Sequence, residues 1–105
     1  MDNRLKKAKE IDLVFKKGTH IYSKSLTILY LESDQTKVAY CVSKKHGKSV
    51  MRNRIKRLLR ESFRKHIPFL NKNYKIVIIP KVSSDYSFET FNKEIDCLLK
   101  KKGLI

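Results

Sequence analysis

One segment of this chain combines an apolar stripe with a dense run of positive charge. Residues 44–66 carry ten Lys and Arg side chains against a single acid, Glu61, and so hold +9 of the net charge of +15. No Gly or Pro interrupts the segment between Ser49 and Pro68, and its residues are good helix formers. At roughly 100° per residue, the predicted helix gathers one apolar stripe: Met51, Ile55, Leu58, Leu59, Ser62, Phe63 and His66. Such a helix packs its stripe on a core, which leaves the opposite side as a fixed cationic surface.

Length and composition predict one folded domain over residues 1–105. A hydrophobic content of 41% argues against a disordered basic tail. A net charge of +15 on a chain of this size points to a polyanionic partner. Nucleic acid is the first candidate, an anionic membrane the second and an acidic protein the third.

Neither a membrane span nor a secretory signal is predicted. Apolar runs such as Ile76–Ile79 are too short to cross a bilayer, and residues 1–15 lack the apolar core of a signal peptide. Cys41 and Cys97 fall in a strand-like and a helix-like run, so both thiols are expected to be buried and reduced. The expected compartment is the cytoplasm.

Hydrophobic periodicity predicts the elements before the basic segment. Residues 3–17 are expected to form a helix that ends at Gly18, and residues 20–32 a strand. Residues 37–43 are expected to form a second strand. The turn at 33–36 would join the two strands in an antiparallel hairpin.

After the basic helix, which Pro68 is expected to stop, a strand and a helix follow. Tyr74–Pro80 is an apolar run typical of a central strand buried on both faces. Ser87 is a good N-cap for a last helix that runs to about Lys102 and ends at Gly103. The order helix, strands, helix, strand, helix defines an α+β fold, a single domain with helices packed on a small, mainly antiparallel sheet.

The histidines and acids do not form a recognisable catalytic or metal-binding motif. His20, His46 and His66 belong to three different kinds of segment, no Cys–His pair has metal-ligand spacing, and the ten acids are scattered. His46 lies in the basic loop, where a solvated or phosphate-contacting role is expected rather than general-base catalysis. The chain alone is therefore expected to be non-catalytic and to bind no metal or cofactor.

The basic segment is instead suited to RNA. Arginine forks match phosphate oxygens, and roughly six to ten cations on phosphates give strong, salt-dependent binding through counterion release. A merely solvated face would need acids interleaved at i, i+4, and only Glu61 is so placed. Asn53, a poor helix former between two arginines, is expected to hydrogen-bond to RNA or to order the first turn. The predicted RNA-binding residues are Lys44, Lys45, Lys48, Arg52, Asn53, Arg54, Lys56, Arg57, Arg60 and Arg64.

These residues resemble a known family. The pattern S-K-K-x-G-K-x-V-x-R-N-R-x-K-R-x-x-R-E-x-F-R over residues 43–64 resembles the RNR signature of the protein component of bacterial ribonuclease P. Parts of residues 4–7 and 14–18, and the pair Leu29-Tyr30, also resemble the family. The resemblance covers the whole chain, and the central motif is long enough to be very specific.

The resemblance implies an endoribonuclease ribonucleoprotein that removes the 5′ leader from precursor tRNA. A large RNA carries the catalytic Mg²⁺ chemistry, and the family's protein binds that RNA with its basic helix and loop, as one monomer per RNA. The resemblance also implies a left-handed β-α-β crossover around the basic helix, against the right-handed rule for parallel strands.

In this family a cleft between the first helix and the sheet holds the single-stranded leader. The matching positions here are Ile11, Phe15, Tyr30 and Lys81, which combine aromatic platforms with a cation, as single-stranded nucleic acid favours. Taken alone, Phe15 would be expected in the core, and the resemblance makes it a leader contact. Ile11 stands where the family usually has an aromatic residue, and Pro80 also departs from the family pattern.

Two other functions are weighed against this one. A ribosomal-type or DNA-binding module would insert the helix in a duplex groove, with base-reading residues near its N-terminus, where only Arg52, Asn53 and Arg54 qualify. A membrane-surface helix would need bulky residues along one full face and no other element to cover them, and the surrounding strands disfavour it.

Overall fold

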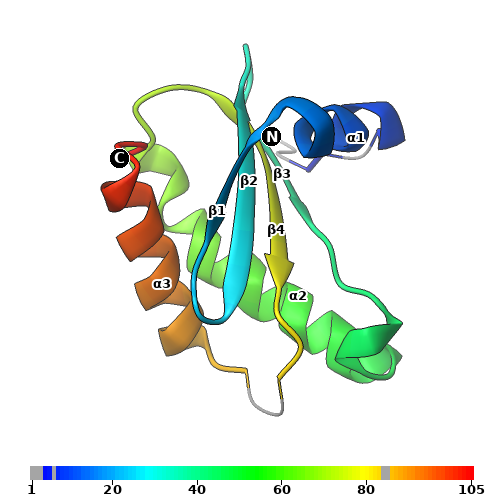
Figure 1. Ribbon diagram of the computed structural model, residues 1–105. Helices are drawn as coiled ribbons and strands as arrows, with labels where there is room; N and C mark the ends of the chain where they lie inside the picture. The colour runs from blue at the N-terminus through cyan, green and yellow to red at the C-terminus, as the bar shows by residue number, and fades with distance from the viewer. Residues whose placement is uncertain (1–3, 6, 84–85) are drawn as a thin grey trace.

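The computed structural model describes residues 4, 5, 7–83 and 86–105, which form three helices and four strands (Figure 1). The elements are α1 Ala8–Lys17, β1 Thr19–Tyr22, β2 Leu26–Glu32, β3 Lys37–Tyr40, α2 Ser49–Arg64, β4 Tyr74–Pro80 and α3 Phe88–Lys101. Two short 3-10 turns, η1 at Lys44–His46 and η2 at Ile67–Phe69, flank α2. The predicted order of elements is confirmed, with one strand more than expected.

β4 lies inside the sheet, as its continuous apolar run predicts. The strand order is β1-β2-β4-β3, with β2 antiparallel to β4 and β3 parallel to β4. Ile76, Val77 and Ile78 have no exposed surface, because helices pack on both faces of the sheet. Two of the three strand pairings are antiparallel, so the mainly antiparallel sheet is confirmed.

The expected hairpin between residues 20–32 and 37–43 is wrong. A turn at 23–25 divides the first stretch into β1 and β2, which pair with each other. β3 ends at Tyr40 and pairs with β4 instead of β2. The buried β4 offers both of its edges to partners, and the seven-residue β2 takes one while the four-residue β3 takes the other. The short connection at 33–36 favoured a hairpin, but loop length alone does not determine which edge a strand joins.

The parallel pairing of β3 with β4 requires a crossover, and α2 supplies it. In Figure 1 both strands run downward with β4 to the left of β3, and α2 returns upward behind the sheet. This is a left-handed crossover, as the family resemblance implied.

The sheet separates two apolar layers. The larger layer lies between the sheet and the pair α2 and α3, and it includes Ile28, Ile55 and Ile95. The smaller layer lies under α1 and comprises Leu5, Val14, Leu29, Ala39 and Val77. Ile28 and Leu29 are neighbours in β2 but belong to different layers, as side-chain alternation requires. α1 covers only the upper end of its face of the sheet in Figure 1.

The ends of two helices differ from the sequence prediction. Gly18 follows α1 as expected, but at φ −73°, so it is not needed for a left-handed turn. A Cβ at Gly18 would instead lie 2.4 Å from the Val14 carbonyl oxygen and 2.9 Å from that of Tyr30. The basic helix ends at Arg64, and Pro68 lies inside η2 rather than at the helix end. The first helix begins at Ala8, later than the predicted start at residue 3, which itself lies outside the described residues, and Arg4 instead forms an isolated parallel bridge with Val38.

Both cysteines are free thiols, and one of them is not buried. Cys41 is half-buried just after β3, whereas Cys97 is exposed on α3. The expectation of a buried Cys97 is wrong, because the helix turns its neighbours Leu98 and Leu99 toward the core and Cys97 away from it.

Glu94 anchors the β1–β2 turn to α3. The hydroxyls of Ser23 and Ser25 donate to its two carboxylate oxygens at 2.5 and 2.6 Å, and the Ser25 N–H donates at 2.8 Å. Burial raises the pKa of Glu94, but these hydrogen bonds and the Lys24 charge outweigh burial and hold the pKa below its ordinary value. The fold therefore favours the carboxylate form.

We expect Glu94→Gln to lower the free energy of unfolding near neutral pH by about 1–3 kcal/mol, because charge-assisted hydrogen bonds to the turn are lost. Since the pKa is lowered in the fold, the stabilisation is present above the unfolded pKa and is lost as the pH falls through the folded pKa. Urea unfolding of both proteins from neutral to acidic pH measures the difference. Asp12→Asn, which breaks an exposed pair with Lys16, is the control. A Glu94→Gln deficit that persists unchanged at acidic pH contradicts this account.

Candidate RNA interface

The apolar side of α2 is buried, as predicted. Ile55, Leu59 and Phe63, four residues apart, have no exposed surface and belong to the layer shared with α3 and the sheet. Leu58 is partly buried, and Met51, near the start of the helix, is 37% exposed. The helix is therefore held over most of its length with its other side turned outward.

The outward side of α2 and the turn before it form what we call the basic surface, the ten residues predicted to bind RNA: Lys44, Lys45, Lys48, Arg52, Asn53, Arg54, Lys56, Arg57, Arg60 and Arg64. Eight of them are exposed, and Arg52 and Lys56 are half-buried. Within the described part of the chain, no ion pair involves any of the ten. Glu61, the one acid of the segment, is exposed and likewise unpaired there. The positive charge is therefore not neutralised by neighbouring acids.

Two arginines of the basic surface are held by contacts other than ion pairs. The Arg60 guanidinium carbon lies 5.9 Å from the ring centre of Tyr40, at the end of β3, within the range of a cation–π contact. Arg52 donates from Nη2 to the Ser49 hydroxyl at 3.2 Å. Burial raises the pKa of Tyr40 to about 12, although the Arg60 and Arg64 charges lower it. The ring therefore stays neutral beside these cations at ordinary pH.

Asn53 is not used to order the first turn of α2. It is exposed, and no hydrogen bond ties its side chain to the described residues. The N-cap of α2 is Lys48, which makes no side-chain cap bond. The Nε of Arg52 is buried and has no hydrogen-bond partner among the described residues. An RNA contact thus remains the prediction for Asn53.

Ser43 and Gly47 shape the basic turn η1. The Ser43 hydroxyl accepts from the Lys45 N–H at 3.3 Å, and the turn leaves Lys44 and Lys45 exposed. Gly47 has φ +125° and ψ −166°, a conformation essentially restricted to glycine. A Cβ there would also lie 3.2 Å from the Met51 side chain. The turn can therefore enter α2 this tightly only with glycine at residue 47.

His46 is buried, contrary to the prediction of a solvated or phosphate-contacting side chain. Only 9% of it is exposed. Its Nε2 donates to the Pro80 carbonyl at 2.7 Å, and its Nδ1 accepts from the Ser43 N–H at 3.0 Å. Both ring nitrogens are engaged within the fold, so the predicted role is wrong.

A second surface lies on the α1 side of the sheet. Ile21 of β1 points into the larger apolar layer, so His20 and Tyr22 point to the α1 side. The Nε2 of His20 lies 3.2 Å from the Phe15 carbonyl oxygen, and the His20 and Tyr22 ring centres are 6.5 Å apart. Phe15 is 38% exposed and Tyr22 64%. We call Phe15, His20 and Tyr22 the aromatic row.

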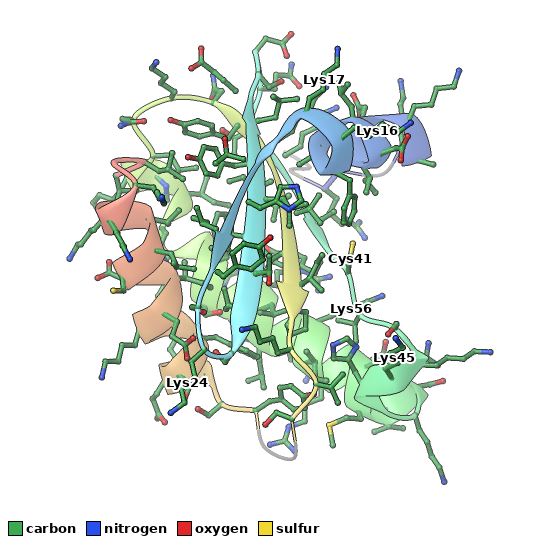
Figure 2. All side chains as sticks on the ribbon, in the orientation of Figure 1. Lys16, Lys17, Lys24, Cys41, Lys45 and Lys56 are labelled. Atoms are coloured by element: carbon green, nitrogen blue, oxygen red, sulfur yellow. The ribbon has the colours of Figure 1, made fainter. Side chains whose placement is uncertain are left out.

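Lysines lie at several places around the sheet in Figure 2. Lys16 and Lys17 end α1, Lys24 lies in the β1–β2 turn, and Lys56 of α2 lies close to Cys41. The Lys56 charge lowers the pKa of the Cys41 thiol, but burial is the larger effect and raises it. Through Lys56, the basic surface reaches the edge of the sheet next to Cys41.

The four predicted leader contacts are not brought together. Ile11 and Phe15 both lie on α1, where Ile11 packs partly buried against the smaller apolar layer. Lys81 is exposed just beyond β4, four residues and about 13 Å along the strand from Val77, which contacts the α1 layer. Its N–H donates to the Ser25 carbonyl at 2.9 Å. Lys81 is therefore at the far end of the sheet from α1.

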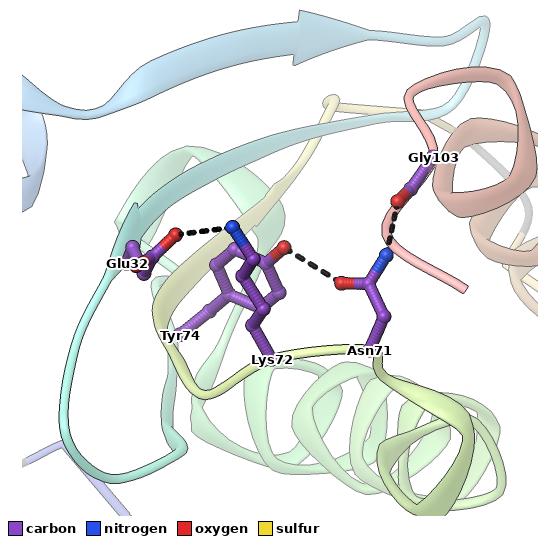
Figure 3. A network of polar contacts seen from close by, with 5 residues as sticks. All are labelled: Glu32, Asn71, Lys72, Tyr74 and Gly103. Carbon is purple, nitrogen blue, oxygen red and sulfur yellow. Dashed lines mark hydrogen bonds and ion pairs between the residues drawn. The ribbon is translucent and has the colours of Figure 1, made fainter.

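Tyr30 lies on the opposite face of the sheet, so its assignment to the same cleft as Phe15 is wrong. It packs against the larger layer, with its ring edge-on to Tyr74 at 5.7 Å between centres. Figure 3 shows the polar network at that end of the fold: Tyr74 donates to Asn71 at 2.9 Å, Asn71 donates to the Gly103 carbonyl, and Lys72 pairs with Glu32 at 3.1 Å. These contacts tie the end of the chain after α3 to the loop before β4.

Two members of the aromatic row, His20 and Tyr22, are not among the residues predicted from the sequence to bind RNA. A signal for them was present, because they flank the apolar Ile21 in a period-two pattern. Placing them beside Phe15 required β1 to be recognised as a separate strand that follows α1 directly.

Two further features of the described residues concern metals and membranes. No three His, Cys, Asp or Glu side chains in this part of the chain gather closely enough to hold a metal ion. None of its helices combines the length and the apolar character needed to cross a bilayer.

An α+β domain that fixes arginines and lysines without ion pairs, among the described residues, on a helix at one face of its sheet, and carries exposed aromatic rings on the other face, defines a nucleic-acid-binding protein. Comparison with known families narrows this class. The family model described as Ribonuclease P matches residues 1–103, and the chain belongs to that family.

Relatives and solved structures agree with the family. The Ribonuclease P protein component of Bacillus velezensis is 35% identical, over 97% of this chain and 90% of its own length. That of Clostridium kluyveri is 40% identical, over 96% and 95%. The Staphylococcus aureus RNase P protein structure has a TM-score of 0.86 at 25% identity, covering 99% of this chain and 98% of that one. The Thermotoga maritima protein gives 0.81 at 28% identity, covering 93% and 96%.

Proposed function

We propose that this chain assembles one-to-one with the large RNA of ribonuclease P through the basic surface, in the cytoplasm, and that the complex removes the 5′ leader of precursor tRNA. The chain is a protein subunit of this endoribonuclease by family. The observation that carries the proposal is the basic surface itself, which is fixed on a buried helix and has no acid paired with it in the described chain.

The basic surface suits the backbone of a folded RNA. Neutralising phosphates with fixed cations releases counterions from the RNA, and this release supplies most of the affinity at low salt. Arg54 and Arg57 are exposed and free of internal partners in the described chain, so their guanidinium forks can pair with phosphate oxygens without first breaking an ion pair. Mg²⁺ and the cleavage chemistry belong, in this proposal, to the RNA.

For the leader, we place the contact at the aromatic row rather than at Tyr30. Single-stranded nucleotides stack on aromatic rings and need cations nearby for their phosphates. Phe15 and Tyr22 offer exposed ring surface on one side of the sheet, and Lys17 and Lys24 lie at the two ends of β1. Ile11 lies one helical turn before Phe15 on α1 and is partly buried. It would add apolar contact with a leader base but no stacking.

Adding the purified chain to the cognate large RNA at low Mg²⁺ tests the proposed function. We expect leader removal from precursor tRNA to be restored, because bound cations of the protein replace part of the Mg²⁺ that screens RNA phosphates. Cleavage is followed on gels with the RNA alone and the protein alone as controls. Leader removal by the protein alone, or no stimulation of the RNA, contradicts the proposal.

Arg57→Ala is expected to weaken assembly with the large RNA and to lower the steepness of its salt dependence by about one unit in log K against log [salt]. Arg60→Ala is expected to have the same effect on the salt dependence and, in addition, to lose the contact with Tyr40. Titrations at several salt concentrations measure both. Lys93→Ala removes an exposed cation on α3, outside the basic surface, and should leave the slope unchanged. If all three variants show the same slope of log K against log [salt], Arg57 and Arg60 are not contacts of the large RNA.

Phe15→Ala is expected to reduce affinity for leader-bearing precursor tRNA several-fold while leaving assembly with the large RNA intact, because about 1–3 kcal/mol of stacking is lost per base. The measurement compares precursor with mature tRNA on the assembled complex. Val14→Ala, at a position with no exposed surface, reports what a loss of core packing alone does. If Phe15→Ala unfolds the domain as Val14→Ala does, Phe15 is a core residue and not a leader contact.

A further inference from the structure

His46 occupies an unusual place for a histidine inside a basic motif. It is the last residue of η1, between Lys45 and Gly47, and it is buried while both lysines of the turn are exposed. One neutral tautomer, with the proton on Nε2, satisfies the two shortest contacts of the ring, and Nδ1 also lies 3.3 Å from the Ser43 carbonyl oxygen and 3.4 Å from the Ser43 hydroxyl. Nε2 donates to the Pro80 carbonyl, and Nδ1 accepts from the Ser43 N–H. The ring thus links the turn to the sheet.

This link stands where the β3–β4 ladder stops. The Cys41 N–H still donates to the Ile78 carbonyl at 2.9 Å. Pro80 has no N–H with which to continue the ladder, although its carbonyl remains an acceptor. The Nε2 of His46 takes that acceptor at 2.7 Å. The Nε2–H of His46 therefore binds the Pro80 carbonyl at the point where the main-chain ladder between β3 and β4 ends.

No other hydrogen bond joins residues 42–48 to the described part of the sheet. The remaining bonds of the turn are local, among Ser43, Lys44, Lys45, His46 and Gly47. Neighbouring lysines repel one another, and no acid pairs with them in the described chain. The bond from His46 to the end of β4 is therefore the hydrogen bond that orients the turn against the described sheet, and Val42 adds apolar packing against the larger layer.

We propose that His46 is a positioning residue for RNA binding: by bonding to the Pro80 carbonyl, it fixes the direction in which Lys44 and Lys45 meet the RNA backbone. The proposal rests on the proposed function. It adds His46, which is not a cation, to the residues on which RNA binding depends. His46 itself touches no phosphate. Its effect reaches the RNA through the two lysines.

Two substitutions separate the link to the sheet from the local bond. In His46→Asn, the amide oxygen can replace Nδ1 as acceptor for Ser43, but the side chain is too short to reach Pro80. In His46→Gln, the longer amide can donate at the position of Nε2. We expect His46→Asn to weaken binding of the large RNA and to lower its salt dependence by about one to two units, as the double variant Lys44→Ala/Lys45→Ala does. His46→Gln should recover most of the wild-type slope.

The salt slope is the readout that a purely structural role would not move. Asn and Gln are uncharged, like the imidazole tautomer that fits the bonds to Ser43 and Pro80, so a flatter slope means that lysines present in the chain no longer meet phosphates. Adding His46→Asn to the double lysine variant should produce no further flattening. Gln35→Asn shortens an exposed, uncharged side chain between β2 and β3, outside both the turn and the aromatic row, and is the control. Urea unfolding of each variant corrects the affinities for any unfolded fraction.

The outcomes distinguish this inference from the proposed function. If the double lysine variant flattens the slope but His46→Asn leaves it as in the wild type, the positioning role is refuted while RNA binding by the turn stands. The positioning role is also refuted if His46→Asn flattens the slope equally when both lysines are absent. If the wild-type chain does not bind the large RNA, the proposed function fails first.

Discussion

Burial of the apolar stripe of α2 is the interaction on which the rest of this structure depends. Ile55, Leu59 and Phe63 lose all of their exposed surface, and each contributes about 1.5–3 kcal/mol by leaving water. On the other side, Arg52, Lys56, Arg60 and Arg64 follow one another at i, i+4, a spacing at which like charges cost only ~0.2–0.5 kcal/mol per pair. Burial exceeds this repulsion several-fold. The helix can therefore present its cations without acids to balance them, and the charge stays available to a polyanion.

The same helix is also the crossover that makes the sheet possible. β3 can pair in parallel with β4 only if a long connection returns the chain to the other end of the sheet. α2 is that connection, so the direction of the basic surface is set by the strands at its two ends. Tyr40, the last residue of β3, lies beside Arg60, and Pro80, the last residue of β4, accepts from His46. The pairing of β3 with β4 therefore also sets the orientation of the cations on α2.

The sequence predicts correctly the features that depend on a single helix or strand. The stripe of α2, the buried run of β4 and the Ser87 cap of α3 all follow from local pattern. Predictions from the sequence were wrong for features that depend on contacts between two segments far apart in the chain. The partner of β3 depends on the free edge of β4, and the burial of His46 depends on Pro80, 34 residues away. The family resemblance supplied the left-handed crossover, which the general rule for parallel strands would have reversed.

Tyr30 was assigned to the wrong face of the sheet because neighbouring residues of a strand point to opposite faces. Successive residues of β2 face opposite layers, so a shift of one position moves a side chain from one surface of the sheet to the other. A match of the pair Leu29-Tyr30 to a family pattern cannot show which of the two faces α1, whereas burial of Leu29 with Val14 does. Once β2 is placed, β1 follows through its pairing, and Tyr22 opposite Thr27 falls on the α1 side. The aromatic surface beside Phe15 is therefore built by strand register, and it comes from β1 rather than from the strand that the sequence motif indicated.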